Sequence, residues 1–369
     1  MLLSFFQIYC YAVNGFSIFC NGILLILSSH KIEAIQELRY FLSNISVAGI
    51  VLSLCVLLVQ PQMVTRGPMC IRVPHGPLSI LNADFVKLTS SIAVVFYMYG
   101  MLSFPLFFVY RTMILVNSTA LGQYFNKRNL LITFGVVFIF CSMEGACLYY
   151  SNIPYEDLFE RLNKTSKVMQ DFDAQYKIPE QLLHHQPQST DTAQTTPATH
   201  HNVSGVILVA EDYRKHLALT GEDYTKNPLI LYFYGIAVVS HAISYIVILI
   251  SAHFMMNTLK EKQGTMSLDT FVANEALVHA VFADAFLPLV FALPLAANAM
   301  LSTFYENSLV WQEFFPAYCI SLVPLLSPMI SIFFIKAYKD LMLSFVTFRF
   351  LRKDKKKAEE DRKAREEAN

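Results

Sequence analysis

Charged residues are scarce in this sequence of 369 residues. Asp, Glu, Lys and Arg together make up 15% of it, whereas they make up about 25% of a typical soluble domain. The 28 basic residues are balanced by 28 acidic residues, so the net charge is zero. A soluble globular fold is therefore disfavoured, and the charge gives no reason to expect a nucleic-acid partner.

Signatures of catalysis and of bound cofactors are also missing. The sequence has no Gly-rich phosphate-binding fingerprint and no Gly-flanked Ser with a partner His. An intramembrane aspartyl protease needs two facing aspartates, and only Asp284 lies deep in an apolar segment. The pairs His184-His185 and His200-His201 have no cysteine or ordered scaffold beside them, so we interpret them as part of a solvated loop. We expect no enzyme activity, no cofactor and no metal site.

Cysteines are almost absent outside the apolar segments. Of the seven cysteines, only Cys70 falls clearly in a connection between two such segments. The long polar stretch from Ser151 to Asn227 has none. The remaining thiols are expected to pack as small apolar groups.

The sequence is rich in long apolar segments. Hydrophobic residues make up 54% of the chain, and the mean hydropathy is +0.43. A helix of about 20 apolar residues spans the hydrocarbon core of a bilayer, and continuous apolar runs favour helices over a membrane β-barrel. The sequence therefore predicts an all-α membrane protein, a bundle of seven transmembrane helices. These helices are expected at about 5–28, 40–60, 88–110, 129–150, 228–256, 271–298 and 310–335.

The distribution of basic residues predicts the orientation of the bundle. Lys and Arg gather in the connections after the first, third and fifth segments and in the tail, which places these parts on the cytoplasmic side. No Lys or Arg precedes the first segment and no small-residue cleavage site follows it, so we interpret it as a retained helix rather than a signal peptide. The N-terminus and the long connection 151–227 are then extracellular. The sequons at Asn163 and Asn202 in this connection are expected to carry glycans.

The chain is expected to divide into a transmembrane domain, residues 1–337, and a cytoplasmic tail, residues 338–369. Tyr338, Leu341 and Met342 repeat at helical spacing, and a polybasic cluster and a mixed-charge stretch follow them. This pattern predicts a short amphipathic helix that lies on the anionic inner leaflet of the bilayer. Such a helix anchors the chain and could also dock a partner.

The third apolar segment ends in the sequence FFVYRTM, in which Tyr110 is followed by Arg111. Alone, an arginine at the end of a transmembrane helix can reach the lipid phosphates and set the depth of the helix. In a seven-helix bundle with an extracellular N-terminus, however, the arrangement resembles a G-protein-coupled receptor. In such a receptor, an arginine at this position is held within the bundle at rest and faces the G protein in the active state. The acidic residue that usually precedes it is replaced here by Val109-Tyr110.

Other motifs resemble those of the nematode serpentine chemoreceptors of the Str-type superfamily. The first segment contains CNGILLIL, with Asn21 and Leu24 in the family's pattern, and the third segment ends in VYR. The connection QPQMVTRGPMCIRVPHGPLSIL is most similar to the delta class, called Srd, at Gln60 and at His75-Gly76-Pro77. Leu78 stands where that class has a cysteine, and the usual disulfide from the third helix to a loop cannot be drawn.

The sixth and seventh segments continue this resemblance. The matching positions are Met266-Ser267, Leu277, Pro288, Pro294, Pro324, Ser327-Pro328 and Tyr338. Asp284 replaces the glutamine that the family has on the sixth segment.

The resemblance implies a chemosensory, olfactory-like G-protein-coupled receptor at the plasma membrane, on the sensory cilium of a chemosensory neuron. Its partners would be the lipid bilayer, a small-molecule odorant or pheromone bound in the outer half of the bundle, and a heterotrimeric G protein. A ligand-gated channel or a small-solute transporter is the alternative function. A transporter of this size would need a polar pathway or matched internal repeats, and the two halves of the sequence show no repeat.

Polar groups within the apolar segments are candidates for the ligand pocket, because a charge in the bilayer centre costs about 2.5–3.5 kcal/mol on insertion scales. The candidates are Tyr97, Glu144, His241 and Asp284. The fifth and sixth segments are joined by a short connection, so His241 and Asp284 could form an internal pair. These groups could equally form hydrogen bonds that hold the helices in register.

The resemblance also assigns residues to G-protein coupling and activation. They are Tyr110, Arg111, Pro288, Pro328 and Tyr338. Proline bends a helix and frees a backbone carbonyl. Pro288 and Pro328 are therefore either static kinks or hinges that let the inner half of the sixth helix swing outward beside Arg111.

Overall fold

The structure is a computed structural model, and it describes residues 2–30, 39–66, 69–116, 127–153, 157, 218–264, 267–304 and 310–346. Within these residues, seven helices are long and apolar enough to cross a membrane. They are α1 (Leu2–Ser29), α2 (Arg39–Val59), α3 (Ala83–Val116), α5 (Lys127–Ser151), α9 (Leu229–Glu261), α10 (Leu268–Phe304) and α11 (Val310–Phe334). The predicted bundle of seven transmembrane helices is therefore confirmed.

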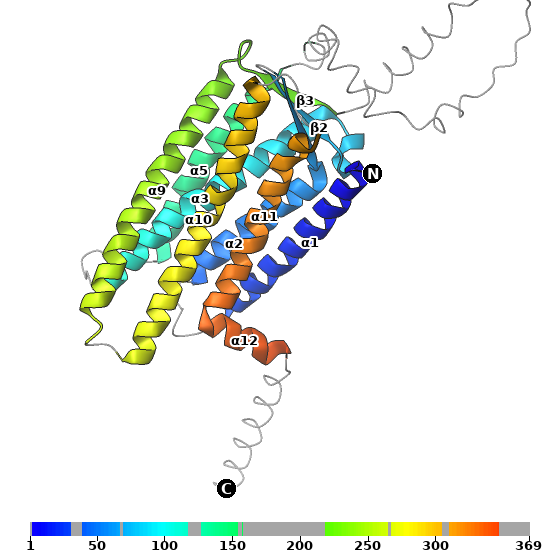
Figure 1. Ribbon diagram of the computed structural model, residues 1–369. Helices are drawn as coiled ribbons and strands as arrows, with labels where there is room; N and C mark the ends of the chain where they lie inside the picture. Colours follow the sequence, from blue (N-terminus) through cyan, green and yellow to red (C-terminus); the bar gives the residue numbers. More distant parts are fainter. Residues whose placement is uncertain are drawn as a thin grey trace, which may run out of the picture.

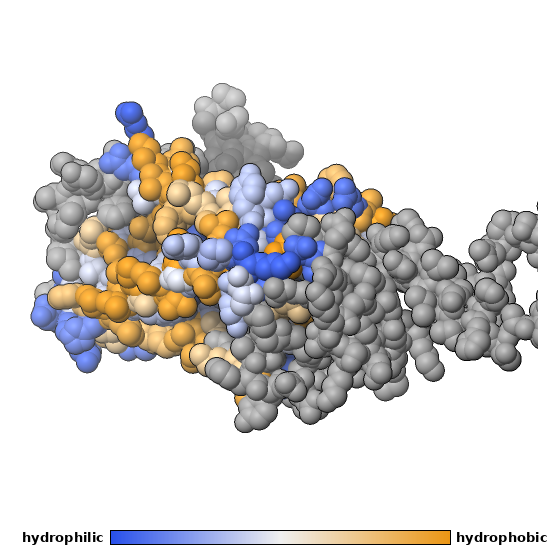
Figure 2. Space-filling view, turned by 90° about the horizontal axis from the view of Figure 1, so that it is seen from above, coloured by the Kyte–Doolittle hydropathy of each residue, from blue (hydrophilic) through white to orange (hydrophobic). Residues whose placement is uncertain are grey.

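The helices run side by side, and different elements cover the two ends of the bundle (Figure 1). At one end, near the N-terminus, lies a small sheet of β1 (Pro61–Arg66), β2 (Met69–Pro74) and β3 (Thr220–Asp223). At the other end lies the short helix α12 (Lys336–Val346). We call these the sheet end and the α12 end. Viewed from the sheet end, hydrophilic side chains lie beside broad apolar areas (Figure 2).

The apolar side chains that a soluble protein would bury lie on the outside of this bundle. Leu131 and Ile139 of α5 and Val238 of α9 are each more than half exposed. Hydrocarbon would cover these side chains in a membrane, and apolar burial then gives little reason for the helices to associate. Small residues and hydrogen-bonded polar residues therefore have to hold the helices together.

Amides and hydroxyls buried on α1 supply such contacts. The Ser17 hydroxyl lies 2.7 Å from the Ser53 hydroxyl of α2. The Asn14 side chain donates to the Ser321 hydroxyl of α11 at 3.1 Å. Asn21 donates to the backbone carbonyl of Pro324 on α11 at 2.7 Å. These bonds fix α1 against both α2 and α11.

Asn21 also explains the glycine that faces it. A Cβ atom added to Gly49 of α2 would lie 2.7 Å from the Asn21 Oδ1 atom, which is too close for a non-bonded contact. Gly49 thus lets α2 approach α1 closely enough to enclose the amide. The Asn-x-x-Leu motif of the first helix is therefore a packing element between helices.

The sheet joins two parts of the chain that are far apart in the sequence. β1 and β2 form an antiparallel hairpin between α2 and α3. β3, which lies shortly before α9, pairs with β2 in antiparallel fashion. Asn152, at the end of α5, forms a single bridge with Glu222 of β3. The sequence of the long connection 151–227 does not predict this strand, because the polar stretch TGED has no apolar alternation.

The His75-Gly76-Pro77 motif closes the hairpin against the end of α2. The backbone N–H groups of His75 and Gly76 both donate to the Val59 carbonyl, at 3.1 and 3.0 Å. Gln60, the residue after α2, adopts a left-handed backbone conformation with φ of 46° where the chain turns into β1. Pro77 then starts the short 3₁₀ helix η2 (Pro77–Ile80). This motif has a clear role in the fold.

The helix α12 packs one face onto the bundle. Tyr338 is fully buried in the main hydrophobic cluster, with Leu341 and Met342 half-buried against it. Lys339 and Asp340 are exposed. The predicted amphipathic helix is thus present, and residues 347–369 of the tail lie outside the described residues.

We predict that Gly76→Ala destabilises the protein. The added Cβ atom would overlap the backbone carbonyl of Leu58, which cannot move aside without disturbing α2. Overpacking of this kind costs about 1–3 kcal/mol, so the thermal unfolding temperature in detergent should fall. Gly235→Ala on α9 is the control, because no atom lies within 4 Å of its added Cβ. Equal unfolding temperatures for the two variants would contradict this role of Gly76.

Candidate functional site

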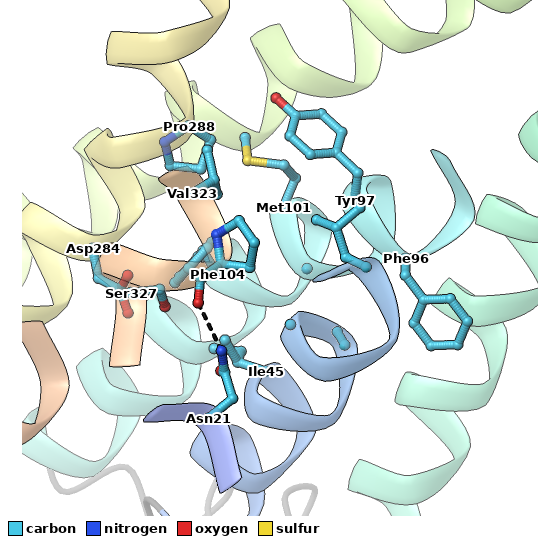
Figure 3. A pocket seen from close by; sticks show the side chains of 15 residues that line it. Asn21, Ile45, Phe96, Tyr97, Met101, Phe104, Asp284, Pro288, Val323 and Ser327 are labelled. Carbon is cyan, nitrogen blue, oxygen red and sulfur yellow. Dashed lines mark hydrogen bonds between the residues drawn. The ribbon is translucent and has the colours of Figure 1, made fainter. Parts of the chain in front are cut away.

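A small cavity lies near the middle of the bundle, between α1, α2, α3, α10 and α11 (Figure 3). Its volume is about 40 Å³, which is room for a few water molecules. Apolar side chains such as Leu52, Phe96 and Met101 form most of its wall. The polar groups on the wall include Asn21, Asp284 and Ser327.

Asp284 is the acidic residue of this cavity. Its side chain is 4% exposed, and the hydroxyls of Ser327 and Ser331 on α11 lie within its reach. Its Oδ1 atom makes no aligned hydrogen bond to any described residue. A buried carboxyl with an oxygen left over is costly in an apolar environment, so this group favours a role beyond packing.

Tyr97 of α3 connects the cavity to α9. It lines the cavity, and its ring stacks on the His241 ring with centroids 6.1 Å apart. His241 does not form the predicted pair with Asp284. Its Nδ1 atom instead lies 2.6 Å from the backbone carbonyl of Ala237, one turn earlier on α9. The ring is oriented toward α3, where it stacks on Tyr97.

Glu144 lies away from the cavity, at the interface of α5 with α9 and α3. It is 2% exposed, and the Ser240 hydroxyl of α9 lies within its reach. Both carboxyl oxygens lack an aligned hydrogen bond within the described part of the chain. The next residue, Gly145, packs so tightly on α3 that an added Cβ would overlap the Val95 side chain. Of the four pocket candidates, the cavity thus brings together Tyr97 and Asp284, with His241 behind Tyr97.

At the α12 end, Arg111 makes a contact between α3 and α10. Its guanidinium donates a hydrogen bond from Nη2 to the Oδ1 atom of Asn274. Tyr110, the preceding residue, turns to α2 and packs on the Phe41 ring at 5.2 Å. Asn274 was not among the predicted site residues, because a single uncharged amide near the end of an apolar segment is a weak sequence signal.

The other coupling candidates are one residue of the cavity wall and two residues nearer the α12 end. Pro288 lines the cavity, and both it and Pro328 lie within continuous helices, α10 and α11. Tyr338 lies at the α12 end, and its hydroxyl has no hydrogen-bond partner among the described residues. Burial raises the pKa of this hydroxyl above its ordinary value. The two sequons, Asn163 and Asn202, and both His pairs lie outside the described residues.

Comparison with known proteins identifies the group to which this architecture is similar. The family model for the serpentine type 7TM GPCR chemoreceptor Str matches residues 6–177. The model for the serpentine type 7TM GPCR chemoreceptor Srd matches residues 185–344. The predicted resemblance to serpentine chemoreceptors is therefore confirmed in both halves of the chain. The His75-Gly76-Pro77 motif lies in the half that the Str model matches.

The fold also matches a solved receptor structure. The crystal structure of squid rhodopsin superposes with a TM-score of 0.51 at 12% sequence identity, covering 89% of this chain and 76% of that chain. At this identity, the likeness concerns the fold alone. A search of curated proteins finds no match to the sequence.

We predict that Asp284→Asn raises the thermal unfolding temperature of the detergent-solubilised protein by a few degrees. The substitution keeps the shape of the side chain and removes a buried acid whose unpaired oxygen costs about 1–3 kcal/mol. Glu313→Gln is the matched control on α11, because this buried carboxyl accepts a hydrogen bond from Gln62 at 2.6 Å. The substitution keeps an oxygen that can accept from Gln62 but removes its charge, so the weaker hydrogen bond should lower the unfolding temperature. A lower unfolding temperature for Asp284→Asn would show that the acid serves the fold.

Proposed function

We propose that this chain, a serpentine-type seven-helix receptor by both family models, is a chemosensory G-protein-coupled receptor. It binds a small odorant or pheromone in the sheet-end half of the bundle and activates a heterotrimeric G protein at the α12 end. The observation that carries the proposal is the contact between Arg111 of α3 and Asn274 of α10 in a bundle with the rhodopsin fold. Its place in the animal would be the sensory cilium of a chemosensory neuron.

The proposal places the sheet end outside the cell and the α12 end in the cytoplasm. Basic residues support this orientation, because Arg39, Arg111 and Lys260 lie toward the α12 end of their helices and the basic tail follows α12. Cytoplasmic connections carry such an excess of Lys and Arg. The N-terminus of this multi-pass plasma-membrane protein is then extracellular.

The Arg111–Asn274 contact holds α10 against α3 in the resting state. A hydrogen bond to a charged group contributes about 1.5–3 kcal/mol, less than the cost of breaking a fully buried ion pair. Because Asn274 is an amide, this hydrogen bond itself involves no opposite charge. Movement of α10 away from α3 would free the guanidinium to face a G protein.

Ligand binding and this contact are connected through α10. The cavity is too small for an odorant as it stands, so a ligand has to widen the space between α3, α10 and α11. Asp284 and Pro288 are on the α10 wall of the cavity. Asn274 lies on the same helix, about 15 Å from Asp284 toward the α12 end at 1.5 Å per residue. A bend at Pro288 would shift Asn274 relative to Arg111, and a ligand that prefers the wider cavity would favour the active state.

We predict that Asn274→Ala raises ligand-independent G-protein activation by about tenfold or more, which corresponds to the loss of one hydrogen bond to a charged group of about 1.5–3 kcal/mol. Asn274→Asp should lower it below the level of the native receptor, because an acidic partner holds Arg111 more strongly. Arg111→Ala should abolish activation. The measurement is dissociation of the G-protein subunits in cells, normalised to receptor at the surface.

The control is Asn298→Ala, which removes an asparagine hydrogen bond at the opposite end of α10, where the Asn298 amide donates to the neutral Gln312 carbonyl at 3.1 Å. Its basal activity should match that of the native receptor. Unchanged basal activity in both Asn274 variants would refute the holding role. Full activation by Arg111→Ala would refute the coupling role.

We predict that the orientation can be read from glycosylation. Asn163→Gln and Asn202→Gln together should abolish a mobility shift that glycosidase also removes, since an extracellular loop is reached by the glycosylation enzymes. Asn117→Gln removes the sequon in the connection that is expected to be cytoplasmic, so it should leave the mobility shift unchanged. A shift that persists in the double variant and disappears in Asn117→Gln would mean that the bundle is inverted.

A further inference from the structure

The guanidinium of one arginine connects strands β2 and β3 at the sheet end. Arg72 of β2 is 4% exposed and forms an ion pair with Glu222 of β3 at 2.5 Å. Its Nε donates to the Thr220 hydroxyl at 3.3 Å, and its Nη2 donates to the Asn152 Oδ1 atom at 2.8 Å. We call these four residues the Arg72 clasp. The clasp holds the α2–α3 hairpin to β3 and to the end of α5.

This connection is made by charge and not by sulfur. All seven cysteines are free thiols. Cys70 lies directly opposite Glu222 in the register of β2 and β3, and burial raises the pKa of its thiol to about 11. Burial also raises the pKa of Glu222, which the Arg72 charge counteracts. The link can therefore open and close without any change of covalent bonds.

The opposite edge of the sheet is held by a chain of hydrogen bonds. Gln62 of β1 donates from Nε2 to the Glu313 carboxyl of α11 at 2.6 Å, so its Oε1 atom faces His75 at 2.7 Å. Burial lowers the pKa of His75 to about 4. The ring is thus neutral, and its Nε2–H must donate, because an amide oxygen only accepts. Gln7 of α1 completes the chain by donating to the His75 carbonyl at 3.2 Å.

The sheet lies across the helices that enclose the cavity. β1 packs against α11 and α10, and β3 packs against α3. Figure 1 shows the strands over the ends of these helices, beside the start of α1. β3 also leads directly into α9, since Asp223 accepts from the Thr225 N–H at 2.8 Å and Asn227 accepts from the Leu229 N–H at 3.1 Å. A displacement of β3 therefore moves the start of α9.

We propose that the sheet is a gate over the cavity, fixed to α1 and α11 at its β1 edge and latched at its β3 edge by the Arg72 clasp. While the clasp is closed, charged water-soluble molecules do not reach the cavity from the sheet end. Loss of either charge leaves the other buried without an opposite charge, which strongly destabilises the closed arrangement. The gate goes beyond the proposed signalling function, and its test needs neither ligand nor G protein.

The gate is tested by thiol labelling of a cysteine placed in the cavity wall. Leu52 lines the cavity and is 4% exposed, so Leu52→Cys is the reporter. The probe is a charged, membrane-impermeant methanethiosulfonate, and the native protein gives the background from its own thiols. Ile80→Cys, at an 86% exposed position of η2, reports which preparation exposes the sheet end. If it reacts in intact cells the sheet end is extracellular, and if it reacts only in inside-out vesicles the orientation is inverted. The gate is tested in whichever preparation reacts.

Leu52→Cys should react slowly when the clasp is intact, and about tenfold or more faster when Arg72→Ala removes it. Glu222→Cys places a thiol directly opposite Cys70, and opposed cysteines in antiparallel strands are close enough to bond. The oxidised form of this variant should react slowly, and the same protein after reduction should react fast. Glu222→Ser is the matched control, which loses the charge without gaining a disulfide, and it should react fast in both conditions.

Equal labelling rates for oxidised and reduced Glu222→Cys, with the disulfide verified, would overturn the gate. Fast labelling of Leu52→Cys with the clasp intact would also overturn it. The oxidised and reduced forms are one protein, so the comparison holds even if Arg72→Ala fails to fold.

Discussion

Hydrogen bonds between buried side chains are the interaction on which this bundle depends, because apolar residues gain little by leaving lipid for the protein interior. Asn14 and Asn21 bind α1 to α11, and the hydroxyl of Ser17 binds it to α2. The close approach at Gly49 follows from the need to enclose the Asn21 amide. The apolar composition determines that the chain enters a membrane, and these few polar contacts determine how its helices are arranged.

The buried carboxyl groups fall into two kinds. Glu313, Glu222 and Asp223 have partners at the sheet end, which are Gln62, Arg72 and Thr225, respectively. Asp284 and Glu144 lie among the helices and keep oxygens without aligned hydrogen bonds to the described residues. Such groups lower stability and persist where the chain needs them for function. Among these five acids, the cavity wall includes only Asp284.

The sequence predicted the helices and two residues of the cavity, because long apolar runs and isolated polar groups are local signals. It placed Arg111 directly after the third apolar segment, whereas α3 continues to Val116. It did not predict the sheet, since β2 and β3 come from distant parts of the chain and pair through backbone groups. The Arg72–Glu222 pair was missed for the same reason, as both residues read as ordinary loop charges. The predicted His241–Asp284 pair was wrong because the orientation of a side chain on its helix is set by packing, here on Tyr97.

The hydrogen bond between Arg111 and Asn274 has a consequence for how the contact between α3 and α10 depends on pH. A guanidinium stays protonated in proteins, and an amide has no proton to exchange in the physiological range. A carboxylate in the same place would weaken the contact whenever acid neutralised it. The hydrogen bond from Arg111 to Asn274 therefore does not itself titrate, so its contribution to the α3–α10 contact does not depend on pH in the physiological range.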